Sequence, residues 1–108
     1  MDRSYQQLDT LIHQPARLSI MAALASAEEV EFAALKSAIN ISDSLLSRYI
    51  GMLEDAKYIK VRKGFVSKRA RTWLSLTSTG REAFEQHIKL LNQIVNQPPN
   101  NNGRGDRT

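Results

Sequence analysis

The sequence contains no cysteine, which excludes disulfide bonds, thiolate metal sites and cysteine nucleophiles. Aromatic residues make up only 6% of the chain, too few for the stacking platform of a single-strand binder. No apolar run approaches the ~18 residues that a bilayer-spanning helix needs, and the start of the chain lacks the layout of a signal peptide. We therefore expect a cytoplasmic protein that has no membrane partner.

The length and the apolar share indicate one small domain. An average domain has ~150 residues, and 42% apolar residues in a chain of 108 are enough to build a core. We expect this domain to cover residues 1–95. Residues 96–108 carry two prolines followed by Asn, Gly, Arg and Asp, and they offer nothing to bury, so they are predicted to be a disordered tail.

Acidic residues are missing from one long segment. Residues 57–81 contain eight lysines and arginines and no acid, whereas residues 1–56 contain four basic and eight acidic side chains. The formal net charge of +4 therefore hides a strongly basic block. Such a block is typical of a surface that binds a polyanion.

Hydrophobic spacing predicts four main helices. They are expected over residues 15–25, 31–39, 43–56 and 78–95. Pro15 suits the first turn of the first helix, and Ser42 and Thr77 are the expected N-caps of the third and fourth.

The third helix has an unusual outer face. Leu46, Ile50 and Leu53 form its buried stripe, which leaves small hydroxyl side chains and one arginine on or near the opposite side. A solvated helix surface normally carries lysine and glutamate. Small polar residues instead let a helix lie close against another surface.

After the third helix the hydrophobic period changes from 3.6 to 2. Residues 58–63 alternate between apolar and basic side chains, and residues 71–76 are again rich in strand formers. We expect an antiparallel hairpin with a basic tip, whose chain reversal lies within residues 64–70.

The expected element order is helix, helix, turn, helix, basic hairpin and long helix. The second and third helices fit the helix-turn-helix arrangement, and the hairpin fits a wing. The predicted fold class is α+β and mostly helical: a winged helix-turn-helix with a three-helix core, a two-stranded wing and a long C-terminal helix. In this geometry helix 43–56 enters the major groove of double-stranded DNA, and the wing, residues 60–71, reaches phosphates or the minor groove.

Several short motifs occur together along the chain. They are Phe32-Ala-Ala-Leu-Lys, Ser47-Arg48-Tyr49-Ile50, Lys63-Gly64-Phe65-Val66, Arg71-Thr72-Trp73 and Leu76-Thr77-Ser78-Thr79-Gly80-Arg81. Their combination resembles the small bacterial and archaeal winged-helix transcriptional regulators grouped near the MarR and ArsR repressors. The resemblance covers roughly residues 8–95. It implies a homodimer that binds operator DNA and pairs through its terminal helices.

Three residues depart from the pattern of these regulators. Leu45 and Tyr49 stand where the relatives often carry a polar residue and a histidine, so base readout is expected to differ. Lys57 stands where the pattern prefers a glycine that ends the helix. A left-handed backbone at Lys57 would cost roughly 1 kcal/mol relative to glycine.

These inferences assign a set of DNA-binding side chains. Arg48 can form two hydrogen bonds to a guanine edge, Ser44 and Ser47 can donate or accept, and the wing cations neutralise phosphates. The full expected set is Ser42, Ser44, Leu45, Ser47, Arg48, Tyr49, Lys60, Arg62, Lys63, Lys68, Arg69 and Arg71.

Apolar spacing also predicts a dimer interface. The last helix carries a stripe with the rhythm of a coiled-coil seam, and a short apolar helical patch precedes the first helix. We expect homodimerisation through the last helix, alone or together with the N-terminal segment. The expected interface residues are Leu8, Leu11, Ile12, Phe84, Ile88, Leu91 and Val95.

Other functions have little support in the sequence. It carries no glycine-rich phosphate loop, no H-E-x-x-H and no nucleophile elbow, so we expect neither an enzyme nor a cofactor. His13 and His87 are far apart and are expected to be surface or capping residues, not metal ligands. A small-molecule effector is possible, but no feature supports one. The alternative that stays open is a winged-helix module that docks on an acidic protein partner, and affinity for DNA separates the two.

Overall fold

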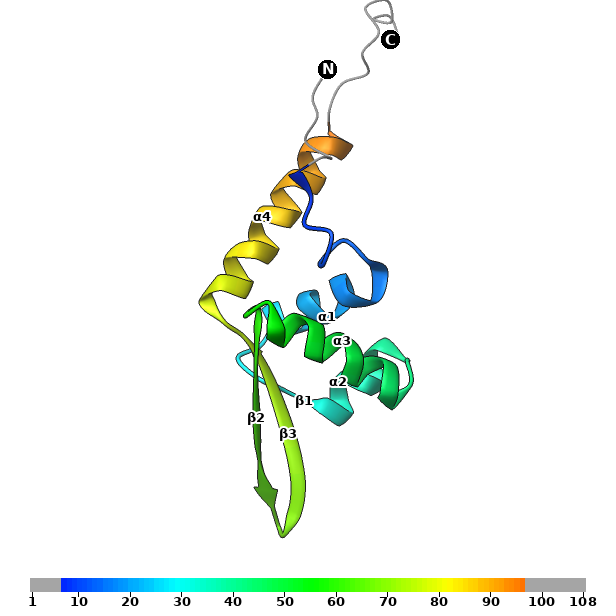
Figure 1. Ribbon diagram of the computed structural model, residues 1–108, viewed down its shortest axis with the longest axis vertical. Helices are drawn as coiled ribbons and strands as arrows, with labels where there is room; N and C mark the ends of the chain where they lie inside the picture. Colours follow the sequence, from blue (N-terminus) through cyan, green and yellow to red (C-terminus); the bar gives the residue numbers. More distant parts are fainter. Residues whose placement is uncertain (1–6, 97–108) are drawn as a thin grey trace, which may run out of the picture.

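The computed structural model describes residues 7–96 as a group of helices from which a long hairpin projects (Figure 1). The elements are α1 (Pro15–Ala25), β1 (Val30–Glu31), α2 (Phe32–Ile39), α3 (Asp43–Asp55), β2 (Ile59–Val66), β3 (Arg69–Leu76) and α4 (Ser78–Val95). The predicted winged helix-turn-helix is confirmed, although its sheet has three strands instead of two. The predicted disordered tail, except for Asn96, lies outside the described residues.

Side-chain and backbone caps set the helix boundaries. The hydroxyl of Ser42 accepts a hydrogen bond from the backbone N–H of Leu45 at 3.1 Å, and the hydroxyl of Thr77 accepts one from Gly80 at 2.9 Å. Both predicted N-caps are therefore confirmed. At the other end of α2, Asn40 adopts the left-handed conformation with φ 62° and so begins the turn to α3.

Lys57 ends α3 in a left-handed conformation, with φ 68°. Its N–H donates to the carbonyl of Glu54 at 2.9 Å, and the N–H of Tyr58 donates to the carbonyl of Leu53 at 2.9 Å. These two hydrogen bonds form a Schellman motif, which satisfies the last carbonyls of the helix. The motif turns the chain directly into β2 at a conformational cost of roughly 1 kcal/mol relative to glycine.

The sheet has the strand order β1-β3-β2, and both strand pairs are antiparallel. The hairpin reverses at Ser67 and Lys68, whose φ values are 51° and 68°. Two successive left-handed residues are characteristic of a type I′ turn, which matches the twist of the flanking strands. The reversal lies within the predicted segment, but Gly64 belongs to β2 and pairs with Arg71.

The short strand β1 was not predicted. The sequence pattern places a helix from residue 31, whereas Val30 and Glu31 pair with Leu74 and Trp73 of β3, and the helix begins at Phe32. A two-residue strand has no detectable period, so only its pairing with β3 defines it.

The segment before α1 is a turn, not the predicted helical patch. One carboxylate oxygen of Asp9 accepts hydrogen bonds from the N–H groups of Leu11 and Ile12, at 2.9 and 3.3 Å. The other accepts from the hydroxyl of Tyr58 at 2.5 Å, and this hydrogen bond raises the pKa of Tyr58 to about 12. The turn places Ile12 in the core with none of its surface exposed.

The core lies where the three helices α1, α2 and α3 meet the inner face of the sheet. Its fully buried side chains include Ile12, Ile20, Met21, Leu24, Leu35, Leu46, Leu53 and Leu74. On α4, Gly80, His87 and Leu90 are buried. Within residues 7–96, no helix is both long and apolar enough to cross a membrane.

Candidate nucleic-acid interface

The outer face of α3 is open to solvent. The stripe of Leu46 and Leu53 is fully buried, whereas Ser44, Ser47 and Arg48 are exposed. Across the described part of the chain, Arg48 makes no hydrogen bond or ion pair, so its guanidinium is free to meet a ligand. The predicted groove face of this helix is therefore not covered by the protein's own packing.

The first turn of α3 is also exposed. The hydroxyls of Ser42 and Ser44 lie 3.3 Å apart, and Ser42 is occupied in capping the helix. Helix N-termini attract phosphates because their free N–H groups and the helix dipole favour negative charge. Ser42 and Ser44 are therefore exposed at the N-terminus of α3, beside the carboxylate of Asp43.

Tyr49, which the sequence assigns to DNA contacts, is held against α1. The side-chain amide of Gln14 donates to its hydroxyl at 3.3 Å, and the guanidinium carbon of Arg17 lies 5.1 Å from its ring centroid. Both Tyr49 and Leu45 are half-buried. Tyr49 therefore positions α3 on α1, and reading a base would require it to leave these partners.

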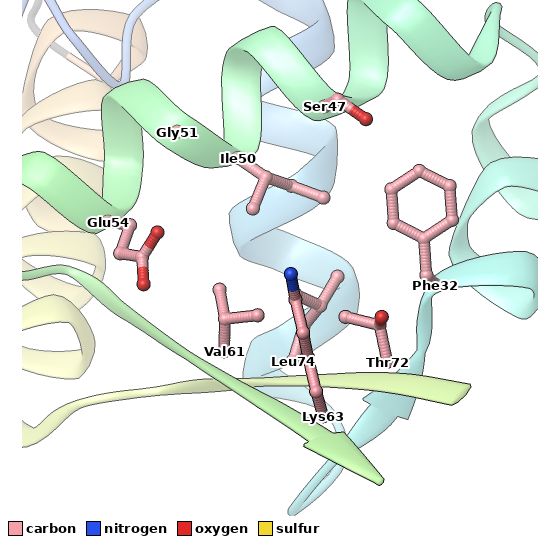
Figure 2. Close-up of a pocket in the computed structure, with 9 residues that line it drawn as sticks. All are labelled: Phe32, Ser47, Ile50, Gly51, Glu54, Val61, Lys63, Thr72 and Leu74. Carbon is pink, nitrogen blue, oxygen red and sulfur yellow. The ribbon is translucent and has the colours of Figure 1, made fainter. Parts of the chain in front are cut away.

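A crevice of about 540 Å³ separates α3 from the hairpin (Figure 2). Ser47, Gly51 and Glu54 line it from α3, while Lys63 of β2 points across it from the hairpin. The remaining lining residues are Phe32, Ile50, Val61, Thr72 and Leu74. The exposed side of α3 and the inner side of the hairpin therefore meet at one continuous surface.

The pleat of the hairpin divides its cations between two faces, because successive residues of a strand point to opposite sides. Lys63 shares the inner face with Val61 and Leu74, which line the crevice. The other predicted strand cations lie on the opposite, outer face: Lys60, Arg62, Arg69 and Arg71. Lys68 lies in the turn at the tip.

Arg62 is bound within the chain and is not a free cation. Its guanidinium donates to both carboxylate oxygens of Glu29, at 2.7 and 2.9 Å, and lies 4.1 Å from the ring centroid of Trp73. The hydrogen bond from Arg62 and its positive charge, together with Lys60, hold the pKa of Glu29 below its usual range. This contact braces the middle of the hairpin against the loop before β1.

Arg71 is bound in the same way. It donates to a carboxylate oxygen of Glu31 at 2.6 Å, and both side chains are partly exposed. Arg62 and Arg71 are therefore each paired with a carboxylate in this structure, and binding a phosphate would require them to share or leave these partners. Glu29 and Glu31 were missed because pairing across the fold leaves no trace in local spacing.

The cations that remain available on the hairpin lie toward its tip. Lys63, Lys68 and Arg69 are exposed, and none forms an ion pair among residues 7–96. Lys60 is exposed as well, and its charge acts on Glu29. The local excess of positive charge is therefore smaller than the sequence suggests, and it is concentrated at the tip.

The two histidines, predicted to be surface or capping residues far apart in the sequence, are in contact. Nδ1 of His13 lies 3.3 Å from Nε2 of His87, and His87 is only 1% exposed. Nδ1 of His87 has no hydrogen-bond partner among residues 7–96. Burial, and secondarily the charge of His13, lowers the pKa of His87, while Asp9 acts in the opposite direction. Within the described residues, no group of three or more potential ligands could hold a metal ion.

The residues predicted for dimerisation divide into three groups. Ile12 is fully buried in the core and offers no exposed surface to a partner. Leu11 and Phe84 are partly buried and pack against the core, and Leu8 is half-buried. The remaining three form a stripe on α4 beside its core-facing side: Ile88, Leu91 and Val95.

Comparison with known proteins identifies the family. A model of the winged helix DNA-binding domain matches residues 16–95. The chain belongs to this family.

Winged-helix proteins of known structure share this fold. A transcriptional regulator homologue from Pyrococcus horikoshii OT3 has a TM-score of 0.81 at 21% identity, over 87% of this chain and 95% of that one. A mutant MarR from E. coli, solved with operator DNA, has a TM-score of 0.68 at 20% identity, over 87% and 72% of the two chains. An uncharacterized Methanocaldococcus jannaschii protein is 29% identical over 84 residues, 78% of this chain and 91% of its own length. The resemblance to MarR-like regulators is thus confirmed at the level of the fold.

Proposed function

We propose that this winged-helix protein is a transcriptional regulator that binds double-stranded DNA in a sequence-specific manner as a homodimer. In this proposal α3 enters the major groove, and the wing contacts phosphates and the minor groove. Arg48, Ser44 and Ser47 read base edges. The phosphates are held by Lys60, Lys63, Lys68 and Arg69.

The crevice between Ser47 and Lys63 is the observation that carries the proposal. It joins an exposed small polar helix face to a cation of the wing, so that one duplex can contact both elements (Figure 2). The braces at Arg62 and Arg71 support the same proposal, because they fix the hairpin beside α3 before DNA arrives. A preformed surface loses less conformational entropy on binding than a mobile one.

The homodimer is supported by the free stripe on α4. Val95 is 76% exposed, and Ile88 and Leu91 are half-buried beside it. The three residues have the spacing of a coiled-coil interface, yet they remain partly exposed in the single chain. Pairing of two α4 helices would remove this apolar surface from water. A two-fold dimer would then present two α3 helices to half-sites about 34 Å apart.

The proposal is tested by selecting bound sequences from a random duplex pool at ~0.15 M salt, where non-specific attraction is already weakened. We expect enrichment of a palindrome whose half-sites are separated by about one helical turn. Absence of any enriched sequence, with retention of DNA only at low salt, would contradict sequence-specific regulation. That outcome would favour the alternative, a module that docks on an acidic protein.

A further inference from the structure

The wing tip carries two large apolar side chains that are exposed within residues 7–96. Among the described residues, the exposed large hydrophobic side chains are Phe65, Val66 and Val95, and the first two are neighbours at the end of β2. Phe65 is 75% exposed and Val66 is 47% exposed. Neither side chain belongs to the core or packs against it.

Phe65 points to the same side of the hairpin as the crevice. It lies two residues beyond Lys63, which lines the crevice, so the pleat gives both side chains the same direction. Its partner across the ladder is Ala70, whose methyl group is too small to cover an aromatic ring. The ring therefore stands free on the side of α3, whereas Val66 points to the outer face.

Cations without an ion-pair partner lie near this ring. Lys63 shares its face of the hairpin, Lys68 lies in the turn at the tip, and Arg69 lies on the outer face beside Val66. None of the three forms an ion pair within the described chain. Glu29 and Glu31 bind the outer-face cations Arg62 and Arg71. An apolar side chain at a cationic tip complements a polyanion that has apolar surfaces between its charges. The minor groove of a DNA duplex, with sugars and base edges between two phosphate rows, has this character.

The hairpin is long and rigid enough to place the ring of Phe65 in a DNA groove. Its eight-residue strands span roughly 26 Å, and Figure 1 shows the tip projecting well beyond the helices. The tip closes in a tight turn of two residues, Ser67 and Lys68. The ion pairs of Arg62 and Arg71 hold the hairpin along its middle, between the base pair Ile59–Leu76 and the tip pair Val66–Arg69. The position of the tip relative to the helices is thus fixed by the rest of the domain.

We propose that Phe65 is an apolar wedge, which the wing inserts from the minor groove against a base-pair step and which partly unstacks that step. The inference rests on the proposed function and adds a contact that opens the duplex. Wedges of this kind favour flexible pyrimidine–purine steps, because these steps cost least to unstack. In this proposal the wing favours DNA sequences that deform easily, whereas α3 favours sequences whose base edges match its side chains.

The test uses the full chain and a duplex enriched by the selection, with 2-aminopurine placed in the step beneath the wing. Phe65→Ala is compared with Val66→Ala, a matched loss of apolar surface on the other face of the same tip. We expect the wild type and Val66→Ala to raise the 2-aminopurine fluorescence. Phe65→Ala should leave the fluorescence at that of free DNA and weaken binding by roughly tenfold, the usual scale of a lost aromatic–base contact.

A second comparison replaces the pyrimidine–purine step with a stiff A-tract. The wild type should lose affinity and Phe65→Ala should not, which shows that the ring acts through the step. The wedge is overturned if the two variants bind alike, or if Phe65→Ala weakens binding without any difference in fluorescence. In both cases sequence-specific binding, and with it the proposed function, still stands. Only a wild-type chain that binds no duplex overturns both.

Discussion

The guanidinium of Arg62 lies 4.1 Å from the ring centroid of Trp73, the residue directly opposite it in the β2–β3 ladder. The same group donates two hydrogen bonds to Glu29. One side chain thus ties together the two strands of the wing and the loop that precedes β1. This contact explains how a basic hairpin can be oriented before it meets an anion.

Arg62→Gln should return the pKa of Glu29 toward its ordinary value, because the hydrogen bond from Arg62 is the main cause of its lowering. The lowered pKa means that the contact stabilises the fold above the ordinary pKa of glutamate and is lost as the pH falls through the lowered value. An NMR titration of the Glu29 carboxyl measures this. Arg69→Gln, which removes an unpaired wing cation, should leave the pKa unchanged, and equal titration curves for both variants would contradict the brace.

Gly80 should tolerate no side chain, because a Cβ there would lie 1.9 Å from the carbonyl oxygen of Tyr58. We expect Gly80→Ala to lower the free energy of unfolding by about 3 kcal/mol or more, since backbone must move to relieve the overlap. Gly51→Ala is the matched control, because nothing lies within 4 Å of its Cβ position. Being within α3, it should stabilise the fold by about 0.5–1 kcal/mol. Urea unfolding measures both free energies, and equal effects would refute the close approach of α4 to the backbone of Tyr58.

His87 should make the fold sensitive to acid. Its pKa is lowered in the folded state, chiefly by burial, so the unfolded chain binds a proton more readily. Stability should therefore be constant above the ordinary histidine pKa of about 6.5 and fall as the pH drops below it. Urea melts of the wild type and His87→Gln between pH 7.5 and 5.5 test this. The variant should lose less stability over that range, and parallel losses would assign the acid sensitivity to other groups.

The α4 stripe should control assembly. Ile88→Lys combined with Leu91→Lys places two charges on the proposed seam and should give a monomer in sedimentation experiments. Gln86→Lys combined with Glu82→Gln adds the same charge at exposed positions on the opposite side of α4 and should leave a dimer. A dimer that survives the first pair of changes would place the interface elsewhere.

The sequence predicted the features that depend on local chemistry. The caps at Ser42 and Thr77 follow from hydroxyl groups that satisfy free backbone N–H groups. The winged-helix order followed from the change of hydrophobic period between α3 and β2.

The features that were missed depend on pairing between distant segments. Glu29 meets Arg62 only because β1 adds to the sheet beside β3, and no local spacing reveals such a contact. His13 and His87 meet because α4 folds back over the segment before α1. The exposure of Phe65 could have been predicted, because an aromatic residue within a basic hairpin has no nearby apolar residues to pack against.

The most direct test of the account compares Arg48→Ala with Lys68→Ala on the selected duplex and on random DNA. A base-reading arginine contributes about 1–3 kcal/mol of discrimination, so Arg48→Ala should weaken binding to the selected duplex and leave random DNA nearly unaffected. Lys68→Ala should weaken both equally and reduce the slope of log affinity against log salt by about one. If both variants lowered affinity for the two DNAs by the same factor, α3 would not read sequence, and the proposed division between helix and wing would be wrong.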